Sequence, residues 1–300
     1  MTRWPRPTPG TAWCASARSC DADQVAAAAR GIGAVLASPG PHAQVASGAD
    51  DPGAFTEDFC RWREIPEIEQ LARHSRVPAI AAALMATPQV RFYHDHVLVK
   101  EGGTRQRTPW HQDQPYYNVD GRGVSAWIPV DPVPEAGCLE LVVRSHRGPG
   151  SCRAPSCAGG TVVPEGTLAE LPDIEADRGA FDIRRFELAP GDAIFFDFLT
   201  VHGAPGFPYP GRRRILSLRY LSADARHAPR RWVTSPPFDG LDAELAAGAR
   251  HGPSAVPGGV AVRSKRGSQT FIQRPRRRCG FKTRAVRRSH WCTCTTSTSW

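Results

Sequence analysis

Three residues with metal-binding side chains lie in distinctive local sequences. His111 and Asp113 form an HxD pair within the stretch Thr108-Pro-Trp-His-Gln-Asp-Gln-Pro-Tyr-Tyr117, and His202 lies far downstream within Leu199-Thr-Val-His-Gly203. Two neutral imidazoles and one carboxylate on one face of Fe(II) leave the remaining positions open for substrate and O₂. The three residues therefore predict a non-haem iron site, and with it an enzyme that carries out an oxidation.

Strand geometry explains how the HxD pair and the distant histidine can meet. In an extended segment residues i and i+2 face the same way, so His111 and Asp113 can point at one metal ion while Gln112 points away. His202 follows a predicted strand at residues 193–198. That position is near the expected mouth of a β-barrel, where a third ligand can complete the site.

Two other interpretations of the histidines remain open. His111 and Asp113 can be a hydrogen-bonded surface pair, with His202 in an unrelated loop. His94 and His96 form an HxH pair on one strand face, which suits zinc or the metal of a cupin. Both lie within an apolar strand, however, and this favours a place in the core or in the wall of a pocket.

The elements that must position these residues change in character along the chain. Helices are predicted at 21–36, with Asp21 or Asp23 as N-cap, and at 64–86, where Pro78 begins a second segment. From residue 90 onward, short segments rich in β-branched and aromatic residues alternate with turns. They predict strands at 90–100, 123–130, 138–143, 186–188, 193–198 and 213–221. We expect a mostly β fold with supporting helices, namely a double-stranded β-helix of the jelly-roll, cupin-like type preceded by N-terminal helices.

The composition divides the chain into a body and a basic tail. Residues 251–300 contain 11 Lys and Arg and no Asp or Glu. Their positive charge is larger than the net charge of the whole chain, +9, so the remaining 250 residues are slightly acidic. We expect a loose N-terminus (1–20), a single domain (21–240) with helices at 21–86 and a jelly-roll core at 90–221, and a basic, disordered tail (241–300).

The composition also bears on the cellular compartment. No run of about 18 apolar residues predicts a membrane helix, and the N-terminus lacks the apolar segment of a secretory signal. The nine cysteines are an odd number without a zinc-type CxxC pair, which favours free thiols in a reducing compartment. We expect a cytoplasmic protein with no membrane partner.

A ferrous oxygenase needs two electrons beyond those taken from its substrate, and 2-oxoglutarate commonly supplies them. The distal carboxylate of 2-oxoglutarate requires a fixed cation, for which arginine offers a bidentate match. The predicted strand at 213–221 places Arg213, Ile215, Ser217 and Arg219 on one face. The residues alone do not choose among its arginines, because a charge run such as 212–214 is usually a solvated turn.

Taken together, the motifs resemble the phytanoyl-CoA dioxygenase family of Fe(II)/2-oxoglutarate oxygenases. The resemblance runs from about residue 90 to 221 and is weaker in the helices from about residue 21. It rests on Leu98-Val-Lys100, Pro109-Trp-His-Gln-Asp113, Ser125-Ala-Trp-Ile-Pro129, Gly137-Cys-Leu-Glu140, Ser145-His-Arg-Gly148, Pro190-Gly-Asp192 and His202-Gly203.

The resemblance implies a role for each candidate residue. The implied iron ligands are His111, Asp113 and His202, and the implied contacts of 2-oxoglutarate are Arg213, Trp127 and His96. There are departures from the family pattern. Ala204 stands where a serine often contacts 2-oxoglutarate, and Arg144 replaces the usual glycine before Ser145. The segment 149–160 has little resemblance to the family's loop.

The implied activity is hydroxylation of a small-molecule or acyl substrate with Fe(II), 2-oxoglutarate and O₂, releasing succinate and CO₂. The carboxylate of Asp113 favours hydroxylation or desaturation, because related halogenases replace it with a small residue. The alternatives are a non-catalytic or truncated family member, and a nucleic-acid-associated protein acting through residues 274–278 and their neighbours. We expect a small-molecule substrate and no nucleic-acid partner. Neither the substrate's identity nor the oligomeric state follows from the sequence.

Overall fold

Two β-sheets dominate the part of the chain that the computed structural model describes, which is residues 12–148, 150–153, 168–238, 240–250 and, by backbone only, 261–263. The larger sheet contains, in order, β1 (Trp13–Ser16), β12 (Ala193–Asp197), β7 (Gly123–Pro129), β14 (Arg212–Ser222), β4 (Gln89–Glu101), β3 (Phe55–Phe59) and β2 (Gln44–Val45), with β16 (Ala261–Arg263) paired to β4. The smaller sheet contains β11 (Ile183–Arg184), β8 (Glu140–Val142), β13 (His202–Ala204) and β5 (Thr108–His111). Two short pairs join β6 (Val119–Asp120) to β15 (Arg226–His227) and β9 (Cys152–Arg153) to β10 (Ala169–Glu170).

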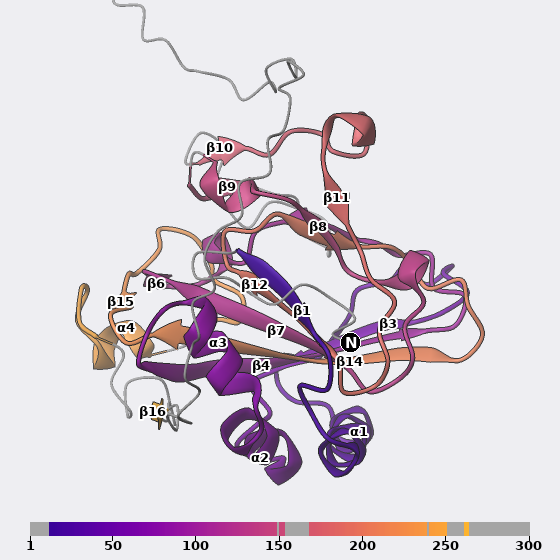
Figure 1. The fold of residues 1–300 in the computed structure, drawn as a ribbon, viewed down its shortest axis with the longest axis horizontal. Coiled ribbons are helices and arrows are strands. Elements are labelled where there is room, and N and C mark those ends of the chain that lie inside the picture. The colour runs from indigo at the N-terminus through magenta and orange to yellow at the C-terminus, as the bar shows by residue number, and fades with distance from the viewer. Residues whose placement is uncertain (1–11, 149, 154–167, 239, 251–260, 264–300) are drawn as a thin grey trace, which may run out of the picture. The chain divides into compact units, whose positions relative to one another are not determined.

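The predicted fold class is confirmed, because both main sheets are antiparallel and the first helices precede most of the strands (Figure 1). Helix α1 (Ala22–Ala37) begins at the expected N-cap, Asp21. The Asp21 side chain accepts from the backbone N–H of Gln24, and the side-chain carbonyl of Gln24 accepts from the backbone N–H of Asp21. The predicted helix at 64–86 is divided near Pro78, as expected, into α2 (Pro66–His74) and α3 (Val77–Leu84). A fourth short helix, α4, spans Leu241–Glu244.

Strand β14 separates an apolar layer from a polar one. Its side chains Leu216, Leu218 and Tyr220 share one core cluster with residues of α1, α2 and α3. Figure 1 shows α1 and α2 on one side of the larger sheet and β8 on the other. The opposite face of β14 carries Arg213, Ser217 and Arg219 toward the smaller sheet, where they line a cavity. Alternation along this one strand therefore assigns packing to one face and chemistry to the other.

Several segments differ from the sequence-based expectation, among them the start of the expected disordered tail, where Leu241–Glu244 form α4. Residues 13–16 of the expected loose N-terminus form β1, which pairs with β12 in a register that sets Trp13 opposite Phe196. This pairing joins segments far apart in the chain, so the local sequence pattern of residues 13–16 does not predict it. The predicted strand at 186–188 is reduced to an isolated bridge between Leu188 and Val133.

The predicted domain boundaries are only partly covered by the described residues. Residues 251–260 and 264–300 of the expected disordered tail, and residues 1–11 of the expected loose N-terminus, lie outside them. No helix in the described part of the chain is long and apolar enough to cross a membrane.

Gly123 offers a test of how tightly the larger sheet packs. A Cβ atom at this position would overlap the ring of Phe198, whereas a Cβ atom at Gly33 in α1 would meet no atom within 4 Å. We expect Gly123→Ala to lower the free energy of unfolding by about 1–3 kcal/mol, because an overpacked ring must shift. Gly33→Ala should raise it by about 0.5–1 kcal/mol, because alanine is the better helix former. Urea denaturation of both variants measures the difference, and equal stabilities would contradict this packing.

Candidate active site

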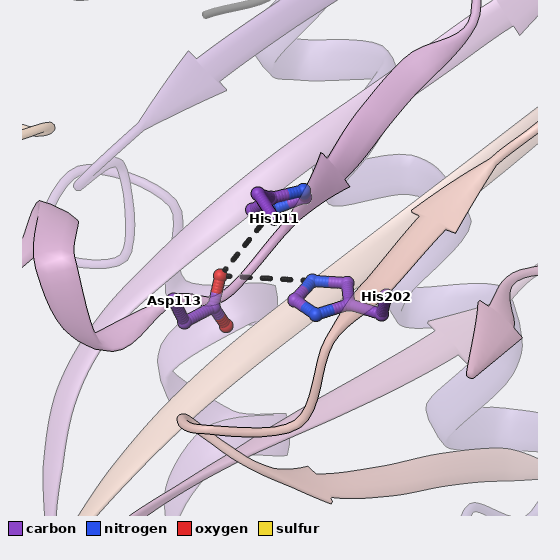
Figure 2. Close-up of side chains that lie close together, drawn as sticks. All are labelled: His111, Asp113 and His202. Atoms are coloured by element: carbon purple, nitrogen blue, oxygen red, sulfur yellow. Dashed lines mark ion pairs between the residues drawn. The ribbon is translucent and has the colours of Figure 1, made fainter. Parts of the chain in front are cut away.

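The two sheets bring the three predicted metal ligands together. Figure 2 shows His111 at the end of β5, Asp113 just beyond it, and His202 on β13, with both rings directed toward the carboxylate. Their ligand atoms all lie within 4.8 Å of one another. Nε2 of each imidazole is 3.7 Å from Oδ1 of Asp113. Asp113 and His202 are only 3% and 4% exposed, which excludes the surface-pair interpretation.

Backbone pairing and a turn produce this convergence. In the antiparallel pair of β5 and β13, His202 stands directly opposite His111, and the ring centroids are 4.1 Å apart. The strand ends at His111, and Asp113 has helical backbone angles at the start of the 3-10 turn Gln114–Tyr116. The carboxylate therefore reaches the imidazoles through a turn rather than through continued strand alternation.

Backbone carbonyls fix the tautomers of both histidines. Nδ1 of His111 lies 2.8 Å from the carbonyl oxygen of Pro109, and Nδ1 of His202 lies 2.9 Å from that of Thr200. A carbonyl oxygen can only accept, so each Nδ1 carries the proton and each Nε2 presents a lone pair. Burial, and next the neighbouring His111, lower the pKa of His202 to about 3, which keeps that ring neutral. This is the protonation state that metal binding requires.

The two oxygens of Asp113 have different surroundings. Oδ2 accepts a hydrogen bond from the hydroxyl of Ser125 and lies 4.0 Å from Nε of Arg219. Oδ1 faces the imidazoles. Burial by itself would raise the pKa of Asp113, but Arg219, the two histidines and Ser125 together lower it to about 2. One charged oxygen is thus left for a metal ion while the other is held by the protein.

Arg219 is the main residue at this site that the sequence did not assign. Its Nε donates to the hydroxyl of Tyr117 at 2.9 Å, and Nη1 donates to the backbone carbonyl of Ser217 at 3.0 Å. Nη2 lies 3.3 Å from Nδ1 of His96. Strand alternation had already placed Arg219 on the face of Arg213. Only the folded register shows that it reaches Asp113.

Gln112 points away from the metal ligands, as expected, and braces the chain behind them. Its side-chain amide donates to the carbonyl oxygen of Leu199 at 2.7 Å, and its carbonyl accepts from the backbone N–H of Cys152 at 2.7 Å. Gln112 thereby ties the HxD turn to the segment that leads into His202. This contact had no signal in the sequence beyond the position of Gln112 between two ligands.

A single cavity contains all six predicted site residues. It has about 930 Å³ of empty space, including its opening to solvent, and it is lined by His111, Asp113, His202, Arg213, Trp127 and His96, among others. The fold thus brings the proposed contacts of 2-oxoglutarate to the same space as the metal ligands.

Arg213 is a buried cation without a charged partner. It is 2% exposed, and no carboxylate of the described residues lies within ion-pair distance of it. Its Nη1 donates to the carbonyl oxygen of Gly137, while its Nε has no hydrogen-bond partner. The guanidinium lies 5.6 Å from the ring centroid of Trp127 and 5.8 Å from that of Phe207. Burial lowers the pKa of Arg213 to about 10, so the site favours an anion that would stabilise the charge.

The rival metal site and the departures from the family pattern have clear structural outcomes. His94 is fully buried against the rings of Tyr93, Tyr117 and Phe238. Within the described residues it belongs to no group of three metal-binding side chains. Arg144 adopts a left-handed conformation, φ 67°, which explains why glycine suits that position. Ala204 lines the cavity without a hydroxyl, and Oγ of Ser217 is buried in the same cavity wall without a hydrogen-bond partner.

Comparison with known proteins gives a family and a set of related folds. The chain matches the phytanoyl-CoA dioxygenase (PhyH) family over residues 16–215. The non-haem alpha-ketoglutarate-dependent carbocyclase SnoK from nogalamycin biosynthesis aligns over 84% of this chain and 92% of its own, with 21% identity and a TM-score of 0.65. The epimerase SnoN from the same biosynthesis aligns over 87% and 95%, with 21% identity and a TM-score of 0.67.

A third similar structure is EvdO2 from Micromonospora carbonacea var. aurantiaca, complexed with 2-oxoglutarate. It aligns over 78% of this chain and 99% of its own, with 20% identity and a TM-score of 0.55. At these identities the likeness establishes the fold. No curated protein matches the chain in sequence.

The hydrogen bond from Ser125 to Asp113 gives a prediction for metal affinity. Ser125→Ala frees Oδ2 and lets the carboxylate rotate, so we expect Fe(II) to bind about tenfold to a hundredfold more weakly. Ser19 is equally buried and bonds the backbone of Ser16 far from the site, so Ser19→Ala is the matched control. Anaerobic titration with Fe(II), followed by calorimetry, measures both. An unchanged affinity in Ser125→Ala would show that Arg219 alone holds the carboxylate.

Proposed function

The chain belongs to the phytanoyl-CoA dioxygenase family, and we propose that it is an Fe(II)- and 2-oxoglutarate-dependent oxygenase that hydroxylates a small-molecule substrate. The family uses iron and 2-oxoglutarate. The observation that carries the proposal is the convergence of His111, Asp113 and His202 with both imidazole lone pairs and one carboxylate oxygen turned toward one another. Two nitrogens and one carboxylate oxygen suit Fe(II) and leave room for further ligands.

In this proposal the three residues hold the iron, and Ser125, Arg219 and Gln112 hold the three residues. Bound iron with 2-oxoglutarate would supply the oxidising power: one atom of O₂ would enter succinate as CO₂ leaves, and the other would enter the substrate. The protein's share is to fix the orientation of both imidazoles, keep His202 neutral, keep Asp113 charged and exclude bulk water from the cavity.

Arg213 is the proposed partner of the distal carboxylate of 2-oxoglutarate. An unpaired guanidinium in a buried site is unfavourable, and a carboxylate that enters beside it removes that cost. Trp127 forms an aromatic wall next to it. In the strand register Ser217 lies between Trp127 and His96 and is paired with both, so its free hydroxyl can replace the contact that Ala204 does not make.

The reaction type is the least constrained part of the proposal. Similar structures include a carbocyclase and an epimerase, so the fold accommodates several outcomes of hydrogen removal. Hydroxylation is supported by Asp113, which occupies a ligand position that halogenases leave to a halide. SnoN has been crystallised with Fe³⁺, alpha-ketoglutarate and nogalamycin RO, which supports a small organic molecule as the kind of substrate that such a cavity admits.

A non-catalytic role is the second candidate, and the site argues against it. A member that had lost catalysis would have no need to retain two fixed tautomers, a charged carboxylate and an uncompensated arginine in one cavity. The nucleic-acid alternative concerns residues 274–278 and their neighbours, which lie outside the described residues.

Anaerobic addition of 2-oxoglutarate to the Fe(II)-loaded protein tests the proposal. We expect a visible charge-transfer absorbance band with the wild type, because 2-oxoglutarate bound to ferrous iron absorbs visible light, and no band with His111→Ala. His74→Ala is the control, since His74 is exposed at the end of α2, and it should behave as wild type. A wild-type protein that binds Fe(II) and shows no band with 2-oxoglutarate would refute the proposed activity.

Arg213→Met separates binding of the cosubstrate from binding of the metal. Loss of a charge-assisted hydrogen bond should weaken 2-oxoglutarate about tenfold to a hundredfold, while Fe(II) affinity stays within about twofold. Arg212→Met is the matched control, because the neighbouring side chain is half exposed and faces Glu101. The intensity of the band at increasing 2-oxoglutarate measures the affinity. Equal losses in the two variants would place the carboxylate elsewhere.

A further inference from the structure

The cavity extends beyond the proposed cosubstrate site, along the same face of the larger sheet, to the edge formed by β2 and β3. The strand register aligns Phe59, His96, Ser217 and Trp127 in one row across β3, β4, β14 and β7. Neighbouring strands are about 4.8 Å apart, so Phe59 and Trp127 are separated by about 14 Å. Because Arg213 and Trp127 occupy one end of this space, the end at β2 and β3 is available to a second molecule.

Glu57 is a buried carboxylate at this second end. It is 4% exposed and lines the cavity, and its Oε2 accepts from the side-chain amide of Gln44 at 2.9 Å. Burial by itself would raise the pKa of Glu57, but His96, Gln44 and Lys100 lower it. Glu57 therefore keeps its charge, and Oε1 has only a 3.4 Å contact to Nε2 of His96.

His96, which the family resemblance assigned to 2-oxoglutarate, instead directs its Nε2 toward that carboxylate. Its ring stacks on Phe59, with centroids 3.8 Å apart and planes at 21°. Arginine can only donate, so the 3.3 Å contact from Arg219 makes Nδ1 of His96 the acceptor and leaves the proton on Nε2. Nε2 is buried and has no hydrogen-bond partner of good geometry. The acceptor oxygen Oε1 and the N–H of Nε2 thus face the same space 3.4 Å apart, which is longer than a good hydrogen bond, so a ligand hydroxyl placed between them can bond to both.

The charges at this end favour an uncharged ligand. Nε of Arg219 lies 4.0 Å from Oδ2 of Asp113, and the positive charge of Lys100 lowers the pKa of Glu57, so each carboxylate has a cation that offsets its charge. Arg213 is reserved for the proposed cosubstrate. Among the described residues that line the cavity, Glu57 is the charged side chain of β2 and β3. The phosphates of an acyl-CoA thioester would be repelled by the carboxylate of Glu57. A cationic ligand would gain little there, because nearby positive charge already offsets the charge of Glu57.

We propose that Gln44, Glu57, Phe59 and His96, the polar subsite, bind the substrate through an uncharged, hydroxyl-bearing ring. Glu57 accepts a hydrogen bond from a ring hydroxyl, Nε2 of His96 donates to a ring oxygen, and Phe59 contributes apolar contact. The inference rests on the proposed function, because it supplies the substrate end of the same cavity. Gln44 is exposed and marks the subsite's solvent side. His96 and Arg219 connect the subsite to Asp113, so a ring held here lies next to the metal ligands.

The test adds three kinds of probe to the anaerobic complex of the full chain with Fe(II) and 2-oxoglutarate. They are neutral cyclic polyols (methyl and aryl hexosides), an acyl-CoA and a primary alkylamine. We expect a neutral polyol to shift the visible band and, in air, to accelerate succinate formation. Glu57→Ala should raise the apparent Kd of that polyol tenfold or more, and Glu57→Gln should raise it less, because an amide oxygen still accepts.

Controls separate this inference from the proposed function. The band with 2-oxoglutarate alone must remain in Glu57→Ala, which shows that the variant is folded and that the metal site is intact. Glu244→Ala, which removes an exposed carboxylate from α4, should match the wild type. An absent wild-type band refutes the proposed function itself. With the band present, the subsite inference fails if the acyl-CoA or the amine binds instead, if no polyol shifts the band, or if Glu57→Ala leaves polyol affinity unchanged.

Discussion

The pairing of β5 with β13 is the constraint on which the site depends. It places His202 directly opposite His111, and cross-strand neighbours of an antiparallel pair are close enough for their side chains to meet. A slip of one residue in this register would turn one of the two rings to the other face of the sheet. Gln112 limits such a slip, because its side chain bonds Leu199 on the segment that leads into His202.

The two faces of the larger sheet have different roles: one packs against the helices and the other lines the cavity beside these histidines. Leu216, Leu218 and Tyr220 pack against the helices, and this burial stabilises a strand whose other face carries polar groups. Without the helices, β14 would present arginines on one side and bare apolar side chains on the other. The helices α1, α2 and α3 therefore contribute to function indirectly, because the free energy gained by packing on one face of the sheet offsets the cost of burying polar groups on the other.

The sequence predicted those parts that depend on local pattern. Helix α1 followed from a capping residue and an alanine-rich run, the division of α2 from α3 from a proline, and the two faces of β14 from strict alternation. The HxD motif and the downstream histidine predicted the three candidate metal ligands, and the family resemblance alone singled out Arg213. The contacts that escaped prediction join residues from different strands: Ser125 with Asp113, Arg219 with His96, and Glu57 with His96. Their partners are set by strand order and register, which no single segment encodes. β1 escaped for the same reason.

Arg213 and Arg219 show how the fold separates two roles that the sequence could not. They lie on the same face of the same strand, and both are almost fully buried. Arg219 has Tyr117, the carbonyl of Ser217, His96 and the nearby carboxylate of Asp113, so its charge is compensated by the protein. Arg213 has one carbonyl oxygen and two aromatic rings. A buried cation that the protein compensates acts as a fixed support, whereas one that it leaves uncompensated gains stability from an incoming anion. Partner count, rather than position in the motif, is the reason to propose Arg213 as the anion-binding residue and Arg219 as the residue that positions Asp113.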